Sequence, residues 1–115
     1  MTKYVTPDER NWFSASIRGQ DMKGTTLWND GHDVATRIYR MPKGLQIPLH
    51  KHEVWVQVVV LSGKMHVSIG DRTIGPGGFY FVEPGDSHIE TALEDSEILV
   101  IKKLPDPADA QQRLA

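Results

Sequence analysis

The chain has 115 residues, 39% of them hydrophobic, and a formal net charge of −2. This length fits one compact domain, and the slightly acidic balance argues against a nucleic-acid surface. Cysteine is absent, which excludes disulfides and thiolate metal sites. The N-terminus lacks the apolar stretch of a signal peptide, and no apolar run approaches the ~20 residues of a membrane helix. We therefore expect a cytoplasmic protein that binds neither nucleic acid nor membranes.

The first segment, residues 1–33, is polar and carries its aromatic residues at irregular spacing. Such a segment has no hydrophobic core of its own. We interpret it as an N-terminal arm that contains one or two short strands.

Residues 34–64 predict extended structure. The sequence VATRIYRM, residues 34–41, is rich in β-branched and aromatic residues and ends at a Pro-Lys-Gly turn. The next segment, LQIPLHKH, contains Pro48, which favours an edge strand because proline cannot donate to a central ladder. VWVQVVVL, residues 54–61, has the composition of a buried strand, and Ser62-Gly63-Lys64 follows as a hairpin turn.

Residues 64–104 continue the pattern of short strands and turns. KMHVSIG alternates apolar and polar residues, FYFV follows a glycine-rich turn, and HIETAL and EILVIKKL form a final predicted pair. Residues 105–115 form a C-terminal tail. Several short strands with Gly/Pro turns and no long helix predict an all-β sandwich or a small antiparallel barrel with a ligand-sized mouth. The barrel domain is expected over residues 34–104.

Two histidines one residue apart, His50 and His52, are the first chemical signal. On an extended strand, residues i and i+2 point to the same face, so the two rings can converge on one point. Imidazole suits Zn, Fe, Ni, Cu and Mn, so the pair does not select a metal. The alternative is two surface histidines in the polar patch HKHE.

Two spaced motifs enclose the histidines and extend beyond them. The first reads Gly44-x5-His50-x-His52-x4-Gln57-x5-Gly63, and the second reads Gly78-x5-Pro84 followed by Gly85-x2-His88. In this order and spacing, the chain resembles the cupin superfamily over residues 34–104. It departs from the family pattern at Gln57, where a glutamate is expected, and at Ala92, where an asparagine is expected.

The resemblance implies an RmlC-like cupin fold, that is, a small double-stranded β-helix or jelly-roll barrel. It also implies one divalent transition metal (Fe, Mn, Ni or Zn) in the barrel mouth. Three histidines carry over as ligands by position: His50, His52 and His88. Gln57 takes the fourth ligand position.

The amide at Gln57 leaves three interpretations open. Gln57 could bind the metal directly, or it could hydrogen-bond a metal-bound water or substrate. It could also be satisfied by backbone groups at a bulge. If the amide replaces a carboxylate, the centre carries more positive charge and binds its metal less tightly. Glu53 directly follows His52, so we expect it to point away from the histidine face.

The resemblance favours a metal-dependent small-molecule enzyme, with dioxygenase-like chemistry as the leading expectation. Isomerase, decarboxylase or lyase chemistry on Mn, Ni or Zn is an alternative, as is a non-catalytic binding or sensing cupin. Catalytic residues are not assigned. Arg37 or Arg40 could face the cavity and meet an anionic substrate, although an outward position is expected for each. Small cupins commonly form dimers in which an N-terminal arm joins the partner's sheet, so we expect a homodimer.

Overall fold

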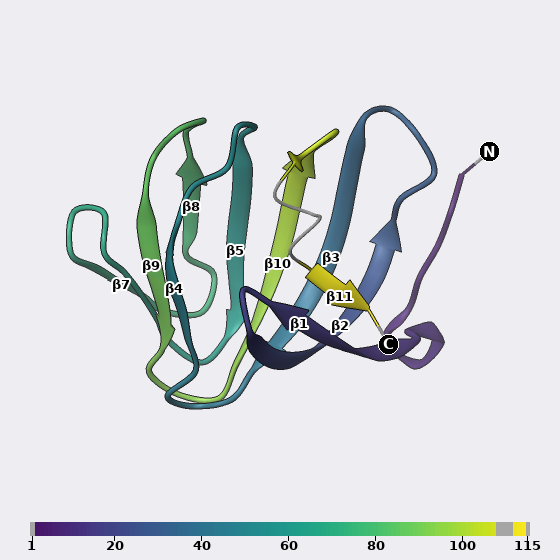
Figure 1. The fold of residues 1–115 in the computed structure, drawn as a ribbon. Coiled ribbons are helices and arrows are strands. Elements are labelled where there is room, and N and C mark those ends of the chain that lie inside the picture. Colours follow the sequence, from purple (N-terminus) through teal and green to yellow (C-terminus); the bar gives the residue numbers. More distant parts are fainter. Residues whose placement is uncertain (1, 108–111, 115) are drawn as a thin grey trace.

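The computed structural model describes residues 2–107 and 112–114 and confirms the all-β antiparallel fold. A short 3-10 helix, Pro7–Glu9, precedes the first strand. In this described part of the chain, no helix is long and apolar enough to cross a membrane. The remaining elements form two sheets, which Figure 1 shows as the halves of a jelly roll.

The larger sheet has seven strands in the order β11-β1-β2-β3-β10-β5-β8. Its sequence-adjacent strands pair as hairpins, whereas β10 inserts between β3 and β5. The strands are β1 Trp12–Ile17, β2 Gln20–Trp28, β3 Val34–Met41, β5 Val56–Ser62, β8 Phe79–Val82, β10 Ser96–Lys103 and β11 Gln112–Leu114.

The smaller sheet has four strands in the order β4-β9-β6-β7. These strands are β4 Gln46–His50, β6 Met65–Val67, β7 Arg72–Ile74 and β9 His88–Ala92. Strand β4 is an edge strand, as Pro48 predicted, and its register with β9 shifts between Ile47 and His50. The break in the ladder therefore falls at the proline, which has no amide proton to donate.

The core lies between the two sheets. Val56, Val58 and Val60 on β5 are at most 5% exposed, while Leu61 is 41% exposed. This alternation follows from the two-residue repeat of a strand. Met65 of the smaller sheet joins the same apolar cluster, so the inward residues of β5 contact both halves of the fold.

The arm and the tail both contribute strands to the larger sheet. Strand β1 pairs with β2, and β2 pairs with β3 along most of its length. In the C-terminal tail, residues 112–114 pair with β1. The predicted arm therefore lies within the chain's own sheet (Figure 1), where it covers one end of the barrel interior.

Candidate metal centre

The two cupin motifs meet in space through the pairing of β4 with β9. His50 ends β4, His88 begins β9, and the two residues are register partners. Their ring centroids lie 4.2 Å apart, and both side chains are buried. The pairing of β4 with β9 thus brings together two histidines that are 38 positions apart in the sequence.

Glu90 completes this pair, although sequence reasoning did not single it out. It follows His88 by two residues on β9, so both side chains point to the same face. Its Oε1 lies 3.0 Å from His88 Nε2 and 3.5 Å from His50 Nε2. The donor atoms of these three buried residues all lie within 4.8 Å of one another.

The chemistry of these donors fits a metal ion. His50 Nδ1 lies 2.7 Å from the Pro48 carbonyl oxygen, so it carries the proton that this oxygen accepts. His50 Nε2 faces the Glu90 carboxylate at 3.5 Å, and together with His88 Nε2 these atoms form a set of nitrogen and oxygen donors that suits a divalent transition metal. Ligand atoms at ~2.1 Å from one ion lie about 3.0–3.4 Å apart, close to the 3.0 Å and 3.5 Å that separate Glu90 Oε1 from the two histidine nitrogens.

Glu90 is held as a carboxylate by its neighbours. Burial by itself would raise the pKa of Glu90, but hydrogen bonds from His50, His88 and Tyr80 outweigh burial and lower it. The Tyr80 hydroxyl donates to Oε2, which leaves Oε1 facing the histidines. Burial, together with the Glu90 charge, raises the pKa of Tyr80 well above its usual value, so the hydroxyl remains a donor. Tyr80 thereby orients the carboxylate.

His52 lies beside this cluster, beyond the end of β4. Its ring centroid is 5.3 Å from that of His50 and 6.3 Å from that of His88. His52 Nδ1 lies 2.7 Å from Asp106 Oδ2, in a side chain with no exposed area. Burial lowers the pKa of His52 and outweighs the opposing effect of Asp106. The neutral ring therefore donates through Nδ1 to Asp106 and keeps the Nε2 lone pair for a ligand.

Burial also opposes protonation of His88, but here the neighbours outweigh it. The hydrogen bond to Glu90 and the Glu90 charge raise the pKa of His88 above its ordinary value. The pKa values of His52 and His88 thus shift in opposite directions, and each histidine has a different carboxylate partner, Asp106 for His52 and Glu90 for His88. The carboxylate that would face a metal ion is therefore also the group that favours protonation of His88.

Gln57 is not brought together with the histidines. It lies on β5 between Val56 and Val58, both of which line the interior cavity, so its side chain points to the opposite face. Its register partners there are Phe81 and Ile101. The side chain that joins the histidines is the Glu90 carboxylate, and not the Gln57 amide. Glu53 is exposed and does not belong to the histidine cluster.

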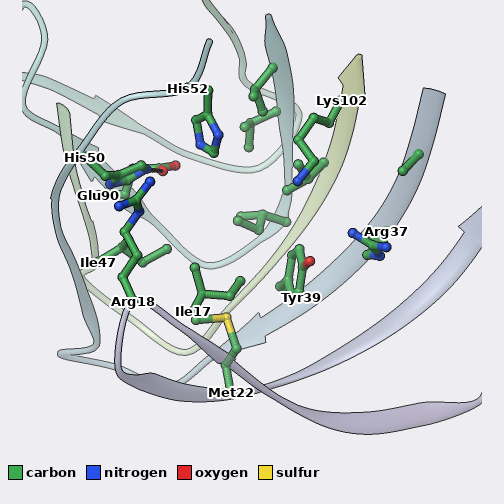
Figure 2. Close-up of a pocket in the computed structure, with 15 residues that line it drawn as sticks. Ile17, Arg18, Met22, Arg37, Tyr39, Ile47, His50, His52, Glu90 and Lys102 are labelled. Carbon is green, nitrogen blue, oxygen red and sulfur yellow. Dashed lines mark ion pairs between the residues drawn. The ribbon is translucent and has the colours of Figure 1, made fainter. Parts of the chain in front are cut away.

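The cluster opens into a cavity of about 60 Å³ between the sheets, and Figure 2 shows its lining. Apolar side chains from β3, β5 and β10 form one wall, among them Val56, Val58 and Ile98. His50, His52 and Glu90 form the polar end. Such a small cavity, apolar with a few convergent polar groups, has the character of a ligand site.

The two strand arginines and the other two histidines of the chain lie in different surroundings. Arg37 lines the cavity, so the outward position expected for it is wrong, whereas Arg40 lies over the Trp12 ring at 3.8 Å and pairs with Glu97. His66 makes an exposed contact of 2.6 Å to Asp71. The remaining histidine, in the loop before β3, is exposed.

Fold and site together define the chain as a cupin. A family model described as "ChrR Cupin-like domain" matches residues 1–106, so the chain belongs to the ChrR cupin-like family. No curated protein shows significant similarity to the sequence.

Solved structures support the same fold. An RmlC-like cupin from Shewanella frigidimarina has a TM-score of 0.74 at 16% identity, covering 90% of this chain and 91% of that one. A predicted oxalate decarboxylase from Thermotoga maritima has a TM-score of 0.77 at 23% identity, covering 90% and 100%. The anti-sigma ChrR of Rhodobacter sphaeroides, solved in complex with SigE, has a TM-score of 0.68 at 18% identity, covering 86% of this chain and 52% of that one.

Proposed function

We propose that this cupin holds one divalent transition metal through His50, His52, His88 and Glu90, and that it is a metal-dependent small-molecule enzyme. The observation that carries this proposal is the convergence of His50 Nε2, His88 Nε2 and Glu90 Oε1 at the buried end of a cavity. We include His52 as the fourth donor because its ring lies 5.3 Å from that of His50 and Asp106 holds its Nδ1, which leaves Nε2 for a ligand.

The chemistry follows from an anionic carboxylate among neutral imidazoles. When bound, the metal supplies Lewis-acid chemistry, and iron would additionally suit oxygenase chemistry. The chain's own residues orient the donors. Tyr80 fixes the angle of Glu90, and the apolar wall strengthens every charge interaction within the cavity.

Elemental analysis tests the metal centre. Protein purified after growth with supplemented iron, manganese, nickel and zinc should contain about one transition metal per chain. Less than a tenth of that amount would overturn the proposal. A chelator-treated sample that regains the metal in proportion to the chain concentration would distinguish a specific site from surface binding.

A sensing role is the second candidate, and the family match favours it. The structure of ChrR bears the description of an anti-sigma in complex with SigE, and this chain matches the cupin-like domain. As a sensor, the chain would change its contacts with a partner when the cavity is filled. Turnover of a small substrate by the metal-loaded protein would favour the enzyme, whereas ligand binding without turnover would favour the sensor.

We further propose that the chain forms a homodimer through the outer face of β5 and β8. Phe79 and Phe81 on the edge strand β8 are 53% and 44% exposed, and Val59 and Gln57 are their register partners. A second copy would cover this apolar face, and a buried Gln57 amide could then pair across the interface. Sedimentation should give twice the chain mass at micromolar concentration, and a mass of one chain would contradict the proposal.

A further inference from the structure

The cavity has a positively charged lining that the metal donors do not explain. Besides the histidines, it is lined by Arg18, Arg37 and Lys102, and Glu90 is the acidic residue among its described lining residues. Figure 2 shows Lys102 and Arg37 on β10 and β3, with Arg18 reaching in from the β1–β2 turn. A buried cavity with this excess of positive charge favours an anionic occupant.

Arg37 is the residue of this group with a buried side-chain nitrogen that has no hydrogen-bond partner among the described residues. It shares the inward face of β3 with Ala35 and Tyr39, which also line the cavity. The buried nitrogen is its Nε. A buried donor on a charged group is costly to leave unsatisfied, so this atom marks a place for an acceptor.

Lys102 connects this region to the metal centre. It is 3% exposed, and its Nζ lies 3.5 Å from Asp106 Oδ2. The same carboxylate oxygen lies 2.7 Å from His52 Nδ1. Asp106 therefore offsets the charge of Lys102 while it holds His52.

The strand register places Arg37 and Lys102 on one face. Val100 of β10 is the register partner of Arg37, and Lys102 follows Val100 by two residues. Diagonal neighbours of this kind lie about 7–8 Å apart, and their Cβ atoms lie somewhat closer. Two long cationic side chains at that separation can contact one small anion from two sides.

We propose that the cavity binds a small carboxylate, which accepts hydrogen bonds from the Arg37 guanidinium and faces Lys102. The planar fork of arginine matches a carboxylate in a way that a lysine ammonium cannot. The volume of about 60 Å³ limits the ligand to a few heavy atoms. If the proposed metal function holds, this carboxylate is the substrate class, and its reactive carbon is directed toward the histidine end.

Acetate, with neutral acetamide as the matched probe, tests the site in the full-length, metal-loaded chain. We expect acetate, followed by 1H–15N NMR, to shift the Arg37 Nε–Hε signal and to bind at least about 10-fold more tightly than acetamide. Arg37→Gln should weaken acetate binding about 10- to 100-fold. Arg37→Lys should recover part of the loss, because it restores charge without the fork.

Arg40→Gln is the matched control, since Arg40 lies on the same strand and pairs with Glu97 outside the cavity. It should leave acetate affinity unchanged. Equal affinity for acetate and acetamide, or acetate binding that survives Arg37→Gln in a folded variant, would overturn the carboxylate site. Metal content measured on the same samples separates this result from a failure of the metal centre, because a metal-free chain would still show the Arg37 shift if the anion site exists.

Discussion

Glu90→Gln should lower metal affinity by at least about 100-fold, whereas Gln57→Glu should leave it unchanged. Glu90 is an ionised, buried carboxylate whose Oε1 lies 3.0 Å from His88 Nε2. Replacing it with an amide removes the negative charge that offsets the metal, and even the loss of a group that only orients a ligand costs 10- to 100-fold. Gln57 points away from the cavity, so a carboxylate there adds no ligand.

Competition against a chelator of known affinity measures both variants. Circular dichroism would confirm that each retains the fold, which we expect because neither substitution changes the side-chain volume. Tighter metal binding by Gln57→Glu, together with full binding by Glu90→Gln, would reverse the assignment and return the fourth position to Gln57.

Gly63→Ala should destabilise the fold by about 2–5 kcal/mol, through backbone strain and a steric clash. Gly63 has a φ of +84°, and a Cβ there would collide with Ser96 Oγ and the Asp95 carbonyl. Ser96 Oγ accepts from the Lys64 amide at 3.1 Å and donates to the Glu94 carbonyl at 2.8 Å. A methyl group would therefore break the contact between the turns that precede β6 and β10.

Gly77→Ala measures the backbone part of this effect alone, so the difference between the two variants gives the steric part. Gly77 has nearly the same backbone angle, with a φ of +83°, but the space beside it is open to 4 Å. It should lose only about 1–2 kcal/mol, the cost of the left-handed conformation. Urea denaturation of both variants measures the difference in unfolding free energy, and equal losses would show that the clash at Gly63 is relieved by movement of the turn.

Strand pattern and turn chemistry were enough to predict most of the barrel. The strand over residues 54–61 was predicted from its composition, and Pro48 marked an edge strand, because both signals are local. The pairing of β1 and β2 within the chain's own sheet was not predictable in the same way. Residues 1–33 could pair with the sheet of their own chain or with that of a partner, and the choice depends on which sheet edge is free in the completed fold.

The metal centre shows where motif spacing and strand geometry disagree. Counting residues assigned Gln57 to the ligand position, although its valine neighbours show that it lies on the other face of β5. The signal for Glu90 was present as the spacing His88-x-Glu90, which repeats the spacing of His50 and His52. Asp106 carried no such signal, because it lies 54 residues from His52, beyond the end of β10, and meets it only in the folded chain.

The coordination of one metal by His50, His52, His88 and Glu90 is the central claim, and anomalous diffraction from crystals of the metal-loaded protein tests it most directly. We predict one anomalous peak at the absorption edge of the bound metal, bonded to His50, His52, His88 and Glu90, with Gln57 remote from it. A peak bonded to Gln57, or the absence of a peak between His50 and Glu90 in crystals that contain one metal per chain, would contradict this account.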